Sequence, residues 1–150
     1  MHVTVKPLCL GMLALCLILL RPIQGLPDET VELVEYMRRL QYFAHKTGLS
    51  IEAKNEPLAH FYLHELEEVI DKLQGIESYD GHPIAALAQV ILKPAFENVE
   101  KGVEAKQFDR AQTAYDAMLA ACNQCHQATA HGFIKIEKRL DNPFMQSFAP

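Results

Sequence analysis

The chain has 150 residues, 49% of them hydrophobic, and a formal net charge of −5 at neutral pH. Its length favours a single domain, and its apolar content is enough for a packed core, which excludes collagen-like and intrinsically disordered classes. The excess of acidic over basic residues repels phosphate and excludes a strong nucleic-acid binder.

The first 25 residues have the pattern of a secretory signal peptide. A basic residue, Lys6, precedes a 13-residue apolar run at residues 8–20, and the segment ends on the small residue Gly25. A retained membrane anchor is the alternative, but a spanning helix needs about 20 apolar residues. We therefore expect cleavage near Gly25, export to the periplasm, and a mature domain of residues 26–150.

Four segments of the mature chain show the three- and four-residue apolar spacing of amphipathic helices. This spacing predicts helices over about residues 28–47, 57–74 and 83–104, and from residue 108 or 109 past residue 126. Four helices with short connections predict an all-α fold, an antiparallel four-helix bundle followed by an irregular C-terminal tail from about residue 132.

Capping residues mark the ends of these predicted helices. Asp28 and Asn55 can cap the first and second helices, and Gly48 is the expected stop of the first. Asp109 and Gln112 have the spacing of a capping box at the start of the last helix. Proline inside the third helix, at residue 94, is expected to kink or offset it.

The chemistry of the chain is concentrated in the segment Cys122-Asn123-Gln124-Cys125-His126. Cys-x-x-Cys-His is the attachment motif for c-type haem. Two thiols three residues apart share a helix face, where they can add to the two vinyl groups of a haem, and the adjacent imidazole can bind the iron. We expect one covalent haem c, with Cys122 and Cys125 as thioethers and His126 as proximal iron ligand.

Other uses of the cysteine pair are alternatives. A thioredoxin-type redox pair needs a preceding strand in a βαβ context, which the sequence lacks. A zinc site needs two further ligands close by, and a structural disulfide is the third alternative. Cys9 and Cys16 leave with the signal peptide, so the mature chain does not have the cysteines of a disulfide-rich scaffold.

A signal peptide, four helices and Cys-x-x-Cys-His on the last helix together resemble the class II c-type cytochromes, the cytochrome c′ group. The resemblance covers roughly residues 28–131, and the three motif residues match the family's motif. It implies a four-helix bundle around one haem. The chain departs from the family in its tail from about residue 132, and in Gln127 where the family commonly has an arginine.

The resemblance also implies where a sixth iron ligand would come from. In the family the first helix covers the distal side of the haem, with methionine on the iron in low-spin members and an apolar residue in high-spin members. Met37 is the methionine of the first predicted helix and the candidate distal ligand, with core filling as the alternative. Met145 and His45 are further candidates.

His60 and His64 form a second candidate site. Their spacing of four places both imidazoles on one helix face, as in a two-histidine metal site. A solvated face is the alternative, because the sequence offers no third ligand in a fixed position.

These features predict a periplasmic monohaem c-type cytochrome that exchanges electrons with redox partner proteins and is not an enzyme. The alternative is a five-coordinate haem module that binds nitric oxide or carbon monoxide. The two functions differ at the sixth iron position. The resemblance also allows a homodimer.

Overall fold

The computed structural model describes residues 33–150. The expected signal peptide over residues 1–25 and the expected helix cap Asp28 lie outside the described residues. The described chain contains α1 (Leu33–Glu52), α2 (Glu56–Gln74), α3 (Ile84–Leu87), the π-helical segment η1 (Ala88–Leu92), α4 (Lys93–Glu104) and α5 (Phe108–Ala128). The predicted all-helical fold is confirmed for this part of the chain. No helix within residues 33–150 is long and apolar enough to cross a membrane.

The bounds of α2 agree with its sequence signals. The Asn55 side-chain oxygen accepts a hydrogen bond from the Leu58 amide at 3.2 Å, which satisfies one of the free N–H groups at the helix start. Pro57 lies in the first turn, where its missing N–H costs nothing. Gly75 follows the last residue of the helix, as predicted.

The predicted stop of the first helix at Gly48 is wrong, because α1 continues to Glu52. Gly48 is buried, and a Cβ atom built on it would lie 2.6 Å from the ring of Tyr115 in α5. The sequence therefore needs glycine here for a close helix approach, and not for a left-handed turn.

Pro94 lies in the first turn of α4, directly after η1. A proline inside an α-helix cannot donate to the carbonyl four residues earlier, and its ring collides with that carbonyl. The wider π turn shifts the hydrogen bonding, and the Lys93 amide reaches the carbonyl of Ala88. The predicted third helix is thus one continuous helical region with a π turn that accommodates Pro94.

The predicted capping box of Asp109 and Gln112 does not form. The helix begins one residue earlier, at Phe108, with Gln107 as the N-cap and no side-chain capping bond. Asp109 lies inside the first turn, where its negative charge still interacts favourably with the helix dipole.

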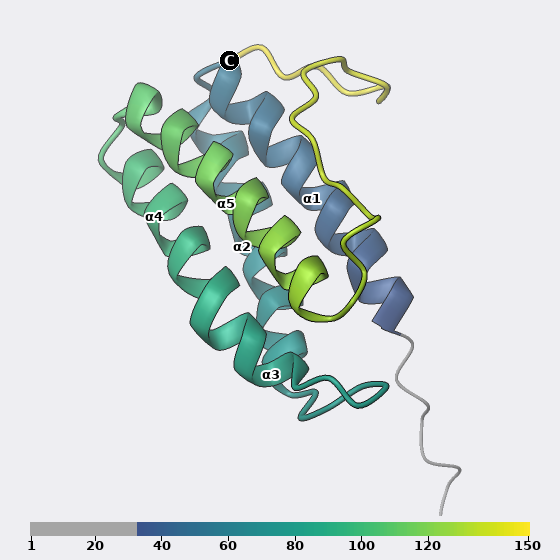
Figure 1. The fold of residues 1–150 in the computed structure, drawn as a ribbon. Helices are drawn as coiled ribbons and strands as arrows, with labels where there is room; N and C mark the ends of the chain where they lie inside the picture. The colour runs from purple at the N-terminus through teal and green to yellow at the C-terminus, as the bar shows by residue number, and fades with distance from the viewer. Residues whose placement is uncertain (1–32) are drawn as a thin grey trace, which may run out of the picture. The chain divides into compact units, whose positions relative to one another are not determined.

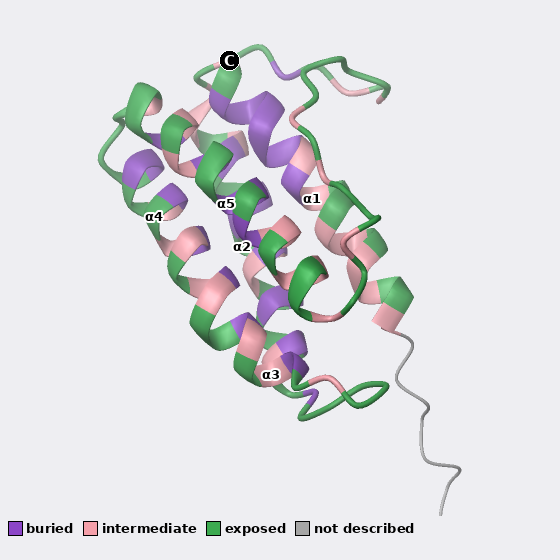
Figure 2. Ribbon diagram, viewed as in Figure 1, coloured by how far each residue is buried: buried purple, intermediate pink, exposed green. Residues whose placement is uncertain are grey.

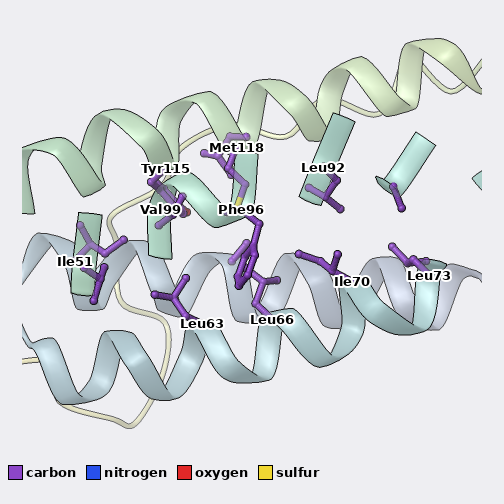
Figure 3. Packing of buried hydrophobic residues seen from close by; sticks show 14 of the residues in the cluster. Ile51, Leu63, Leu66, Ile70, Leu73, Leu92, Phe96, Val99, Tyr115 and Met118 are labelled. Carbon is purple, nitrogen blue, oxygen red and sulfur yellow. The ribbon is translucent and has the colours of Figure 1, made fainter. Parts of the chain in front are cut away.

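The long helices surround a main hydrophobic core, and a second, smaller cluster includes Leu49, Tyr62 and Phe148. Consecutive long helices run in alternating directions (Figure 1), an arrangement compatible with the expected bundle. Buried side chains line the inner faces (Figure 2), and Figure 3 shows Phe96 of α4 pointing toward the α2 side chains Leu63 and Leu66. The most extensive helix contacts are α1 with α2 and α4 with α5, whereas the seam between α1 and α5 is less extensive and includes the close approach of Gly48 to Tyr115.

Residues 129–150, here called the C-terminal strap, have neither helix nor strand and cross this seam (Figure 1). The strap is tied to α5 by an ion pair of 2.9 Å between Lys138 and Asp116. It is tied to α1 by His45, whose Nε2 lies 3.0 Å from the Asp141 carbonyl oxygen. The strap is therefore part of the packed domain.

A buried lysine holds the far end of the strap. The Lys46 ammonium donates hydrogen bonds to the Tyr62 hydroxyl at 3.1 Å and to Gln146 Oε1 at 3.0 Å. It also lies 4.8, 5.0 and 4.6 Å from the ring centroids of Tyr42, Tyr62 and Phe144. The aromatic faces stabilise a cation that has been removed from most of its water.

The Gly102→Ala variant is expected to be less stable than the wild type by up to about 2 kcal/mol. A Cβ atom on Gly102 would lie 2.8 Å from Cα of Ala111, and backbone cannot rotate away as a side chain can. The steric cost of about 1–3 kcal/mol exceeds the gain of about 1 kcal/mol from replacing a helical glycine. Urea unfolding measures the difference. Gly75→Ala, at a helix end, is the control, and an equal loss in both variants would contradict this prediction.

Candidate functional site

The motif residues lie on the last turns of α5, at the end of the bundle where α1 begins (Figure 1). Cys122 packs against the main core, and Cys125 and His126 are half-buried. The loop before α3 reaches the same end, since the rings of His82 and His131 are 6.3 Å apart. The helix therefore presents the predicted set of two thiols and one imidazole at one end of the fold.

Both thiols are free in the structure. Burial raises the pKa of Cys122 to about 12, and the neighbouring Cys125 adds to this effect. Burial also raises the pKa of Cys125. A redox-active thioredoxin-type pair requires a lowered thiol pKa and a strand before the motif, and residues 33–150 contain no strand. The environment therefore disfavours that alternative.

The raised pKa of Cys122 predicts a loss of stability in alkali. A thiol in the unfolded chain titrates near pH 8.5, well below the folded-state value of about 12. The stabilisation is complete below about pH 8.5 and is lost as the pH rises toward 12, by up to about 1.4 kcal/mol per pH unit. Urea unfolding of the reduced chain without haem at pH 8 and about pH 10 measures this change.

Cys122→Ala should remove most of this pH dependence, and Cys125→Ala should keep most of it. An identical fall in stability for the wild type and Cys122→Ala would contradict the prediction. Comparing the variants with the wild type also cancels the contribution that lysines and tyrosines make to the pH dependence of stability in this range.

The hydrogen bonding of His126 distinguishes its two ring nitrogens. Nδ1 lies 2.9 Å from the carbonyl oxygen of Ile134 in the strap. A carbonyl oxygen only accepts, so Nδ1 carries the proton and Nε2 carries the free lone pair of the neutral ring. Metal-binding histidines have this arrangement, in which the second nitrogen donates to a carbonyl or carboxylate.

The candidate distal ligands are in different surroundings. Met37 is half-buried on α1 and packs against the main core. Met145 lies fully exposed on the strap. His45 already uses Nε2 in its contact with the Asp141 carbonyl and stacks near Phe144 at 5.3 Å. Of the three candidates, only Met37 combines contact with the core and a thioether free of polar partners.

The first half of α1 is loosely packed. None of residues 33–43 is buried, whereas most of residues 44–51 are, and the change is visible along α1 in Figure 2. The half-buried apolar side chains here pack against the core from the edge; they are Leu33, Tyr36, Met37, Leu40 and Phe43. An apolar group bound at this end of the bundle would gain contacts with them.

The donor set fits a covalently attached haem, because it supplies two unpaired thiols and an imidazole with a free Nε2. Two cavities of about 250 and about 240 Å³ lie beside residues 135–137 of the strap. Neither is lined by Cys122, Cys125 or His126, and both are smaller than the usual ligand pocket of about 300 Å³ or more. These two cavities therefore have neither the lining residues nor the volume that the group would need.

The pair His60 and His64 is exposed on α2. His64 Nε2 lies 3.7 Å from the Glu68 carboxylate, an exposed ion pair when the imidazole is protonated. Within residues 33–150, no group of three or more histidine, cysteine or acidic side chains is arranged to hold a metal ion. This geometry favours the solvated-face alternative.

Sequence reasoning missed the partners of the motif in the strap. The Asn123 side chain binds both backbone groups of Ile136: its Nδ2 donates to the carbonyl at 2.8 Å, and its Oδ1 accepts from the amide at 2.7 Å. Ile134, two residues earlier, supplies the carbonyl to His126. The sequence does not show which backbone groups a side chain will bind. The asparagine inside the motif was the only residue whose type suggested such a bond.

Comparisons with protein-family models, curated proteins and solved structures found no match to this chain.

Proposed function

We propose that the chain is a monohaem c-type cytochrome whose haem is held by Cys122, Cys125 and His126. One observation carries the proposal: two free thiols and an imidazole with an available Nε2 lie together at the end of α5. The four-helix arrangement and the motif on the last helix also support the resemblance to the cytochrome c′ group. The proposal includes export to the periplasm by the predicted signal peptide.

The protein residues have separate roles. Cys122 and Cys125 would hold the group as thioethers, since addition of a thiol to a vinyl group consumes no oxidant or reductant. His126 offers Nε2 as the proximal ligand, and the Ile134 carbonyl orients its ring. The half-buried apolar side chains of early α1 would shield such a group from water. When bound, haem supplies an iron that changes its oxidation state by one electron.

Electron transfer is the function we propose, with Met37 as the distal residue. Its thioether has no polar partner and lies on the loosely packed half of α1. A methionine thioether that bound a haem iron would raise its reduction potential, which suits electron exchange with a redox partner protein.

An absorption spectrum of the protein expressed with c-type maturation machinery tests the proposal. We expect a Soret band, and sharp α and β bands on reduction, as in a six-coordinate low-spin iron. Met37→Leu, a change of similar volume, should broaden these bands while the fold remains; Met145→Leu is the matched control. A broad band in the wild type would instead favour the gas-binding alternative. Absence of a Soret band would overturn the haem proposal.

A further inference from the structure

The strap lies against α5 at the motif itself. Asn123, between the two cysteines, makes the paired hydrogen bonds to Ile136 described above, at 2.8 and 2.7 Å. One side chain thus satisfies the donor and the acceptor of a single strap residue. Two simultaneous bonds fix both the position and the orientation of that peptide segment, in a way that one bond would not.

The segment fixed by Asn123 includes Ile134, whose carbonyl oxygen accepts the hydrogen bond from Nδ1 of His126. Ile134 is two residues from Ile136, and its amide also donates to the His131 carbonyl at 2.8 Å, so Asn123 and this turn together hold its carbonyl oxygen beside His126. The Ile136 side chain packs against the main core and supports the same placement. The ion pair of Lys138 with Asp116 is exposed at its acidic end and contributes less.

His131, itself a residue of the strap, makes a similar contact within a short turn. Its Nδ1 lies 2.6 Å from the carbonyl oxygen of Thr129, which belongs to its own turn. That contact is local, whereas the contact of His126 spans eight residues and depends on the fold of the strap. The Nδ1 partner of His126 thus comes from eight residues further along the chain, and that of His131 from its own turn.

We propose that Asn123 is a positioning residue: by holding Ile136, it places the Ile134 carbonyl on Nδ1 of His126 and so fixes the ring with Nε2 unprotonated. The effect on the tautomer stands on the geometry of the chain alone. Its consequence for an iron rests on the proposed function. A carbonyl partner raises the basicity of the imidazole, which favours the oxidised iron and lowers the reduction potential.

The tautomer can be measured on the full mature chain without haem. Two-dimensional NMR of the ¹⁵N-labelled imidazoles distinguishes Nδ1–H from Nε2–H forms, at about pH 8, above the usual range of imidazole titration. The wild type is expected to show His126 as the Nδ1–H form. Asn123→Ala should shift His126 toward the Nε2–H form that predominates in free histidine, while His131 in the same spectrum stays unchanged.

Two further variants keep the test specific. Asn142→Ala makes the same chemical change within the strap, where Asn142 bonds only to strap residues, and should leave His126 unchanged. Asn123→Asp keeps the acceptor for the Ile136 amide and loses the donor, so His126 should shift less than in Asn123→Ala. An Nδ1–H form of His126 that persists in Asn123→Ala, or an equal change at His131, would overturn the proposal.

Haem-loaded protein supplies the second readout. The midpoint potential of Asn123→Ala is expected to rise above those of the wild type and Asn142→Ala. Failure of the wild type to attach haem would contradict the proposed function and leave the NMR result standing. Attachment of haem with the same potential in all three proteins would contradict the positioning role of Asn123 toward the iron.

Discussion

The Cys122→Ala, Cys125→Ala double variant is expected to lose all haem that survives denaturation. Covalent haem remains with the polypeptide in a denaturing gel or acidified organic solvent, and only the two thiols of the described chain can form such bonds. Without them, His126 alone would hold the group, and unfolding would release it. Haem staining of a denaturing gel measures the loss.

Single variants separate the two attachment points. Cys122→Ala and Cys125→Ala should each keep one thioether and stain, with the reduced α band at longer wavelength because one vinyl group stays conjugated. His126→Ala should disturb the spectrum, and added imidazole should restore part of it. His131→Ala is the matched control, because His131 is exposed and lies five residues after His126. Full staining of the double variant would contradict the assignment of the thiols.

Phe96→Ala is expected to lower the free energy of unfolding by about 3–5 kcal/mol, the usual cost of removing a buried aromatic ring. Phe96 has no exposed surface and lies in the main core between α4 and the α2 side chains Leu63 and Leu66 (Figure 3). Loss of the ring removes its apolar contacts and leaves a cavity. The surrounding helices cannot move together to fill it, because each is packed against other helices. Urea unfolding, monitored by circular dichroism, measures the change.

Phe133→Ala is the matched control for this measurement. Phe133 lies on the strap with 79% of its surface exposed, so the same chemical change should cost no more than about 0.5 kcal/mol. A similar loss of stability in both variants would show that Phe96 does not hold the core together as the packing indicates.

The bounds of the helices were partly predictable. Apolar spacing and local capping located α2 to within a residue, because Asn55, Pro57 and Gly75 act on neighbouring backbone groups. The stop expected at Gly48 was wrong, because the reason for glycine there is the ring of Tyr115 on another helix. The rule that glycine ends a helix uses only neighbouring residues, so it cannot predict a contact between residues so far apart in the sequence.

The candidate site was also only partly predictable from the sequence. The sequence by itself determined the donor set, because the spacing of Cys122, Cys125 and His126 along a helix places them together in any fold that keeps the helix. Only the tertiary structure decided which nitrogen of His126 is free, because that depends on the Ile134 carbonyl, which the strap brings back to α5 and Asn123 holds there. Side-chain identity is written in the sequence, whereas the position of a backbone carbonyl is set by the fold of the chain around it.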